Sequence, residues 1–99
     1  MLIIAGHILT DPSLAEALAA DLRAGRERTR AEDGCLAYNF ALDEASEGSV
    51  LVYERWRDQT SLDVHLATPE VADLMGGWVE KIQIAVKIYD IAGERDMGV

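Results

Sequence analysis

Four short segments of the chain are rich in apolar residues that fall on two alternating faces. These segments are Leu2–Leu9, Cys35–Leu42, Ser49–Trp56 and Gln83–Ile91. Alternation with a period of two is typical of β-strands, whose side chains point in turn to the two faces of a sheet. The polar sequence DEASEGS at residues 43–49 separates the second and third segments, so we expect these two strands to form an antiparallel hairpin.

Between these strands, apolar residues recur at a spacing near 3.6, which predicts helices. The first helix is expected to begin at Asp11 and Pro12, a capping residue followed by a proline at the first helical position, and to end near Thr29. Two further helical pieces are expected after the hairpin, one capped by Asp58 and the next starting at Thr68. Their inward faces carry Leu62, His65 and Leu66, and then Val71, Leu74, Met75, Trp78 and Ile82.

The order β-α-β-β-α-β predicts an α+β protein with the ferredoxin-like plan, a single domain over residues 1–99 with its helices on one face of an antiparallel sheet. The strands are nevertheless apolar on both sides. Leu2, Ile4 and Ile8 oppose Ile3 and Leu9 on the first strand, and Leu51 and Tyr53 oppose Val50 and Val52 on the third. A bare apolar face of this size exceeds what a monomer usually exposes. We therefore predict a homodimer packed sheet against sheet.

The composition argues against several classes of partner. Nine lysine and arginine residues against 18 aspartate and glutamate residues give a net charge of −9, which leaves no basic face for nucleic acid or an anionic membrane. The single cysteine, Cys35, forms no disulfide within the chain, and the start MLIIAGHIL lacks the basic region and cleavage site of a secretory signal. No apolar run approaches about 18 residues, the length of a membrane span. We expect a cytoplasmic protein.

His65 is the strongest candidate for chemistry. It follows Leu62 by three positions and therefore lies on the inward face of its helix. One interpretation is a buried histidine bonded to a carbonyl or to a carboxylate such as Glu54. The other is a base or hydrogen-bond donor in a pocket between the helices and the sheet. An imidazole, with an ordinary pKa of about 6.5, is suited to moving a proton at neutral pH.

Four other residues are candidates for contact with a ligand. His7 lies in mid-strand and Asn39 is polar among alanines, so each needs a polar partner that either a ligand or the protein can supply. Trp56 ends the third strand and Trp78 lies on the last helix. Each tryptophan is either a large core residue or a flat wall for an aromatic ligand.

Glu54 is a charge inside an otherwise apolar strand, and we expect it to pair with Arg55, Arg57 or a histidine. The sequence has no cysteine or histidine cluster at metal-ligand spacing and no glycine-rich phosphate loop. No metal site is therefore predicted.

Several short motifs resemble those of the antibiotic biosynthesis monooxygenase family. The matching residues are Glu32-Asp33-Gly34-Cys35-Leu36 and Tyr38, then Tyr53-Glu54-Arg55-Trp56, and finally Leu62, His65 and Thr68-Pro69. They span nearly the whole chain. The resemblance implies a small dimeric α+β barrel.

The same resemblance implies oxygenation of electron-rich aromatic substrates, such as quinols, without a metal or flavin cofactor. An ionised phenol can itself give an electron to O₂, so the protein has to bind the substrate, favour its anion and exclude water. In this hypothesis His65 orients or deprotonates the phenol and Trp56 stacks on it. Further substrate contacts are assigned to His7, Asn39 and Trp78. Either face of the strand at residues 35–42 can line the pocket.

Two other functions stay open. Relatives with this barrel degrade haem or process small signalling molecules, although a net charge of −9 with few cations near the expected pocket suits haem propionates poorly. The chain is alternatively a non-catalytic dimer that binds a small ligand, with both histidines satisfied internally. A cavity bordered by His7, His65 and Trp56 would favour the enzyme.

Overall fold

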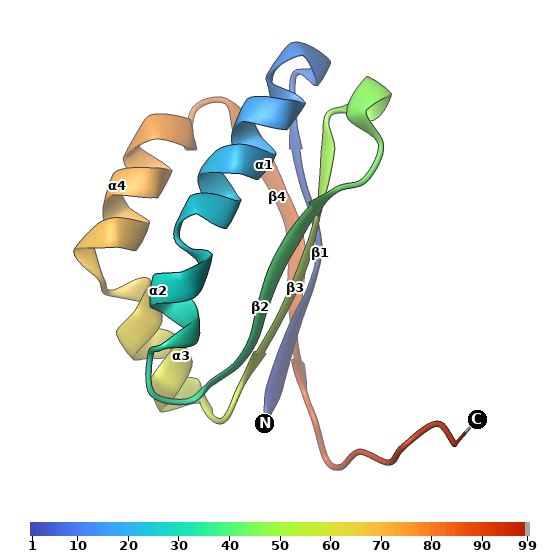
Figure 1. Cartoon of the computed structure of the whole chain (residues 1–99), viewed down its shortest axis with the longest axis vertical. Coiled ribbons are helices and arrows are strands. Elements are labelled where there is room, and N and C mark those ends of the chain that lie inside the picture. Colours follow the sequence, from blue (N-terminus) through green and yellow to red (C-terminus); the bar gives the residue numbers. More distant parts are fainter. Residues whose placement is uncertain (99) are drawn as a thin grey trace.

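The molecule has two layers, a four-stranded antiparallel sheet and a set of helices on one of its faces (Figure 1). The computed structural model describes residues 1–98. Its strands are β1 (Leu2–Thr10), β2 (Cys35–Leu42), β3 (Ser49–Trp56) and β4 (Ile82–Asp90), in the spatial order β2-β3-β1-β4. This is the predicted ferredoxin-like α+β fold. Each strand lies within one residue of its predicted bounds, because alternation is a strong local signal.

The helices follow β1 and β3 along the chain. They are α1 (Ala15–Ala24), α2 (Arg26–Arg30), α3 (Gln59–Leu66) and α4 (Pro69–Trp78), with short 3₁₀ turns at Pro12–Leu14 and Ala45–Glu47. The predicted capping residues accept backbone hydrogen bonds where the helical segments begin: Asp11, Asp58 and Thr68. None of the helices within residues 1–98 has the length and apolar character needed to cross a membrane.

The prediction of one continuous helix from Asp11 to Thr29 is wrong. The segment begins as a 3₁₀ turn, and the helix is interrupted at Gly25, which separates α1 from α2. Glycine costs a helix interior about 1 kcal/mol relative to alanine, so an interruption is favoured at this position. The break lets α2 pack on β2 as a separate element, so that the turn after α2 meets the end of the sheet beside α3 (Figure 1).

The strand register decides which side chains face the helices. Ile4 of β1 is paired with Glu54 of β3, and Glu54 is paired with Tyr38 of β2, so these three residues share one side. That side is the helix-facing one, and its buried core consists of Leu2, Ile4, Ile8, Leu18, Ala19, Leu22, Tyr38, Phe40, Val50, Val52, Trp56, Leu62 and Trp78. The face of β2 that lines the interior is therefore the one with Tyr38 and Phe40.

The edge strand β4 is poorly covered. Ile84 and Ile88 are paired with Ile8 and Ile4 and so lie on the helix-facing side, yet they are 58% and 51% exposed. The helices pack mainly on β1, β2 and β3. The helices thus lie on one face of the sheet, as predicted, and an apolar strip of β4 remains open on that face.

Within residues 1–98, the other side of the sheet is free of helices (Figure 1). It carries exposed apolar side chains, as predicted. Leu51, Tyr53 and Tyr89 are the large ones. His7 is paired with Leu51, and Asn39 with Tyr53, so both polar candidates belong to this bare face. The packing of the bare face against a second copy stays a prediction.

Candidate active site

A cavity of about 290 Å³ lies between the sheet and the helices. Three of its lining residues are polar: Tyr38, Glu54 and His65. The rest of the lining is apolar and comes from the strands and from α1, α3 and α4. Because Ile84 and Ile88 line it and are more than half exposed, the cavity opens to solvent along β4. An apolar hollow with a few polar groups is the usual form of a small-molecule site.

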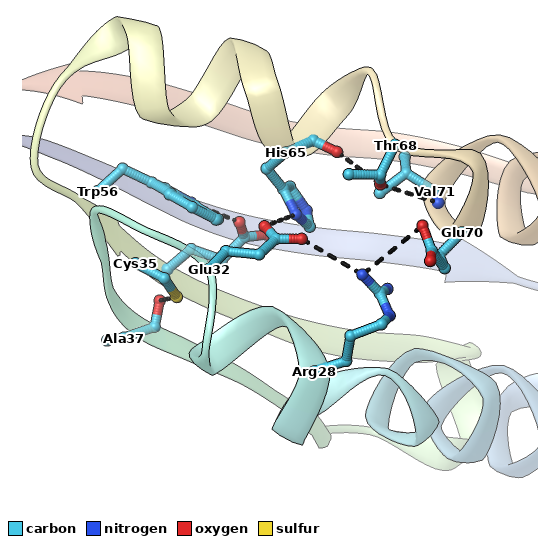
Figure 2. A network of polar contacts seen from close by, with 10 residues as sticks. Arg28, Glu32, Cys35, Ala37, Trp56, His65, Thr68, Glu70 and Val71 are labelled. Carbon is cyan, nitrogen blue, oxygen red and sulfur yellow. Dashed lines mark hydrogen bonds and ion pairs between the residues drawn. The ribbon is translucent and has the colours of Figure 1, made fainter.

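His65 is buried in the wall of this cavity and bonded to a carboxylate. The residue is 3% exposed, and its Nδ1 lies 2.8 Å from Oε2 of Glu32 (Figure 2). A carboxylate only accepts, so this contact indicates that Nδ1 carries a hydrogen. Nε2 is then the acceptor of the neutral ring, and within residues 1–98 it has no hydrogen-bond partner. Its lone pair is available to a ligand.

The loop that carries Glu32 is tied to the start of α3. Asp58 caps α3 through Ser61, and the hydrogen bonds from Ser61 are the main reason why the pKa of Asp58 is lowered to about 2. Arg57 donates two hydrogen bonds to Asp33. Gly34 has φ +84°, and a Cβ there would collide with the Ser61 side chain. This tight fit holds the loop against the helix that carries His65.

Glu32 is held from two sides. While Oε2 contacts His65, Oε1 lies 3.3 Å from Nη1 of Arg28, which also lies 3.8 Å from Glu70 of α4 (Figure 2). The carboxylate is thereby oriented before any ligand arrives. Within the described part of the chain, no group of three or more histidine, cysteine, aspartate or glutamate side chains is placed to hold a metal ion.

Trp56 packs against polar residues of the cavity wall on the side away from the cavity. It is completely buried and does not line the cavity within residues 1–98. Its ring lies 4.8 Å from that of His65 between centroids, and its Nε1 donates a 2.9 Å hydrogen bond to Oε1 of Glu54. The structure thus places Trp56 against two lining residues, and not where it could stack directly on a ligand.

Glu54 lies on the cavity wall in an apolar setting. Burial raises the pKa of its carboxyl, and the hydrogen bond from Trp56 and the charge of His65 oppose this only in part. The expectation that Glu54 is paired with Arg55, Arg57 or a histidine is wrong. The hydrogen bond to Glu54 comes instead from the indole of Trp56. Arg55 contacts Glu94, and Arg57 contacts Asp33, on the surface.

His7 and Asn39 are not brought to the cavity. The Nε2 of His7 lies 3.2 Å from Asp43, and Asn39 accepts a 2.6 Å hydrogen bond from Arg30. Neither residue lines the cavity, because the alternation of the strands turns both away from the helices. Within residues 1–98, the cavity bordered by His7, His65 and Trp56 is therefore not formed, so this feature does not favour the enzyme over the non-catalytic dimer.

Trp78 is a core residue of α4 that also lies outside the cavity lining of residues 1–98. Its Nε1 donates to Asp21 of α1 at 2.9 Å, and the ammonium of Lys81 lies 5.6 Å from its ring centroid. This tryptophan joins α4 to α1 and shapes the cavity only indirectly. Of the five predicted site residues, His65 alone lines the cavity.

Sequence reasoning missed Glu32 and Tyr38 as site residues. Tyr38 packs edge-on against the ring of His65 at 5.4 Å, and burial, followed by the charge of Glu54, raises its pKa. The alternating pattern of β2 would have placed Tyr38 in the cavity if the inner face of that strand had been known. Glu32 could have been found from its place in the EDG motif beside the strand start.

The fold and the cavity together define a class: small ferredoxin-like α+β proteins with an apolar cavity and a buried imidazole–carboxylate pair. The family model for antibiotic biosynthesis monooxygenases matches residues 1–76. The chain belongs to this family, as the motifs in its sequence implied. Membership supports a monooxygenase-like or small-molecule-binding role.

Similar proteins come from several bacteria. The uncharacterized protein sll1783 of Synechocystis sp. is 34% identical over 98 residues, covering 92% of this chain and 63% of that protein. The protein Rv0793 of Mycobacterium tuberculosis is 35% identical over 66 residues, covering 67% of this chain and 64% of that protein. The chain thus spans a little less than two thirds of the length of either relative.

Crystal structures confirm the fold. A Deinococcus radiodurans protein that bears the same family name has a TM-score of 0.86 at 25% identity, with both chains covered completely. The protein PA3566 of Pseudomonas aeruginosa has a TM-score of 0.76 at 34% identity, covering 92% of this chain and 94% of that one.

Proposed function

We propose that the protein is a cofactor-independent monooxygenase that oxidises a small, electron-rich phenol or quinol with O₂. The observation that carries this proposal is the bond of 2.8 Å between Nδ1 of His65 and Glu32, beside an apolar cavity. The bond leaves Nε2 as a base that can reach a bound hydroxyl group. Glu32 then stabilises the imidazolium that forms when the proton is taken.

The reaction needs no electron source other than the substrate. His65 takes the phenol proton, and the phenolate gives one electron to O₂, forming a phenoxyl radical and superoxide. These combine in a carbon–oxygen bond at a ring carbon that carries hydrogen. The resulting hydroperoxide loses water, with the proton returned from His65, and leaves a quinone. One phenol and one O₂ thus give one quinone and one water, which balances all atoms and electrons.

The cavity favours these steps by its surroundings. Apolar side chains keep water from the phenoxyl radical and from superoxide, which limits side reactions. The charge that develops on the substrate oxygen lies beside the imidazolium of His65, in a setting where such an interaction is stronger than in water.

Haem degradation has less support. The cavity of about 290 Å³ is at the lower end of the range of roughly 300–1,000 Å³ for ligand sites, and its lining within residues 1–98 includes no lysine or arginine for the propionates.

The exposed apolar side chains of Leu51, Tyr53 and Tyr89 support a homodimer joined through the bare face. Light scattering would give the mass in solution. A dimeric mass is expected, whereas a monomer at high concentration would contradict the assembly.

The function is tested by O₂ uptake with a panel of phenols and quinols that vary in size. We expect consumption of one O₂ per substrate and incorporation of one labelled oxygen atom from ¹⁸O₂ into the quinone, measured by mass spectrometry. Metal chelation is expected to leave the rate unchanged. If no phenol on the panel is oxidised faster than in buffer, the non-catalytic ligand-binding function takes its place.

A further inference from the structure

The cavity holds a second acceptor near His65. Glu54 is nine-tenths buried and lines the cavity, and only its Oε1 accepts the hydrogen bond from Trp56. Within residues 1–98 its other oxygen, Oε2, has no hydrogen-bond partner. Oε2 is not among the side-chain atoms of the described residues that are fully shielded from solvent without a partner, so it stays accessible from the cavity. A polar atom that a ligand covers there needs a hydrogen-bond partner. The free oxygen is thus a contact that a ligand can complete.

The polar groups of the lining gather at one end of the cavity. Trp56 links two of them, because its indole nitrogen donates to Glu54 while its ring lies 4.8 Å from that of His65. Tyr38 packs against the same imidazole. The remaining lining residues are apolar, including those along α4 and β4. The two acceptor residues therefore lie at the same end of the cavity, and the lining residues at the opposite end offer no acceptor side chain.

We propose that Glu54 is a specificity-determining residue and that the cavity takes an aromatic ligand with two adjacent hydroxyl groups, of the catechol type. One hydroxyl donates to Nε2 of His65 and the neighbouring one to Oε2 of Glu54. A para-dihydroxy isomer places its second hydroxyl against the apolar wall, where it loses its hydration without a partner. This inference rests on the proposed function and narrows its substrate class.

The test compares two positional isomers, 4-tert-butylcatechol and tert-butylhydroquinone, which have the same atoms and charge. Their binding to the whole protein is measured by calorimetry under argon, so that no turnover occurs. We expect the wild type to bind the catechol at least about tenfold more tightly, as a hydrogen bond to a charged group would give. The monomethyl ether of the catechol, which lacks the second donor, should lose this advantage.

Two variants assign the effect to its residue. Glu54→Gln keeps an acceptor for Trp56 but replaces the free carboxylate oxygen, and should bring the two isomers to within about twofold. Asp43→Asn makes the same charge change in the loop after β2, where Asp43 contacts His7 away from the cavity, and should keep the tenfold preference. If Glu54→Gln does not fold, the methyl ether comparison in the wild type decides alone.

The outcomes separate this inference from the proposed function. Equal binding of the isomers by the wild type, or an unchanged preference in Glu54→Gln, overturns the role of Glu54 even if quinols are oxidised. A catechol preference without O₂ uptake on any phenol overturns the monooxygenase instead and leaves a catechol-binding protein.

Discussion

The two histidines of this chain differ in burial, and this difference decides which of them is suited to proton transfer. Both are paired with a carboxylate, His65 with Glu32 at 2.8 Å and His7 with Asp43 at 3.2 Å. The side chain of His65 is 4% exposed and that of His7 is 43% exposed. Water screens the exposed pair, which contributes little. The buried pair lies beside an apolar cavity, where water screens it less, so of the two pairs it is the one that the proposed proton transfer can use.

The largest effect is expected from removing one imidazole at a time. His65→Ala takes away the base and should lower the rate of O₂ uptake by about 10²- to 10⁴-fold. His7→Ala should leave the rate within about twofold, because the sheet separates His7 from the cavity. Steady-state oxygen-electrode measurements of the two variants make the comparison. Equal losses in both would show that burial does not distinguish the histidines.

A smaller effect is expected from the carboxylate partners. Glu32→Gln can still accept from His65 but no longer carries the charge that stabilises the imidazolium, and kcat should fall about ten- to a hundredfold. Asp43→Asn, the matched change beside His7, should leave kcat unaltered. KM is expected to change little in Glu32→Gln. A loss confined to KM would assign Glu32 to substrate binding only.

The smallest effect concerns the stability of the cavity wall. Burial raises the pKa of Glu54 above its ordinary value of 4.5, so the folded protein binds this proton more tightly than the unfolded chain does. The resulting stabilisation is complete at a pH below the pKa that Glu54 has in the unfolded chain. It is lost as the pH rises through the pKa that Glu54 has in the folded protein. Glu54→Gln should therefore stabilise the protein at neutral pH, by about 1 kcal/mol.

Thermal melts across the acidic to neutral range measure this difference. The melting temperature of the wild type should fall relative to that of Glu54→Gln as the pH rises above about 4.5. Parallel curves for the wild type and Glu54→Gln would mean that Glu54 titrates normally.

The sequence contained most of the fold because its signals are local. The period-two pattern located the four strands, and Asp58 and Thr68 marked helix starts through hydrogen bonds made a few residues away. The interruption at Gly25 was overlooked, because a single glycine is often tolerated in a helix.

The site was less accessible from the sequence because its contacts are distant along the chain. The inward position of His65 followed from helical spacing, but its partner Glu32 lies 33 residues away. Strand alternation grouped His7 with Ile3 and Leu9, yet it could not say which face the helices would cover. That choice depends on tertiary packing, and it removed His7 and Asn39 from the site.

The tautomer of His65, observed by ¹⁵N NMR at mildly alkaline pH, tests the proposed base most directly. We expect a hydrogen on Nδ1, bonded to Glu32, and an unprotonated Nε2 whose signal shifts when a phenol is added. Glu32→Gln should weaken this preference. A hydrogen on Nε2 in the free protein, or an Nε2 signal that no phenol perturbs, would contradict the claim that this atom is the base.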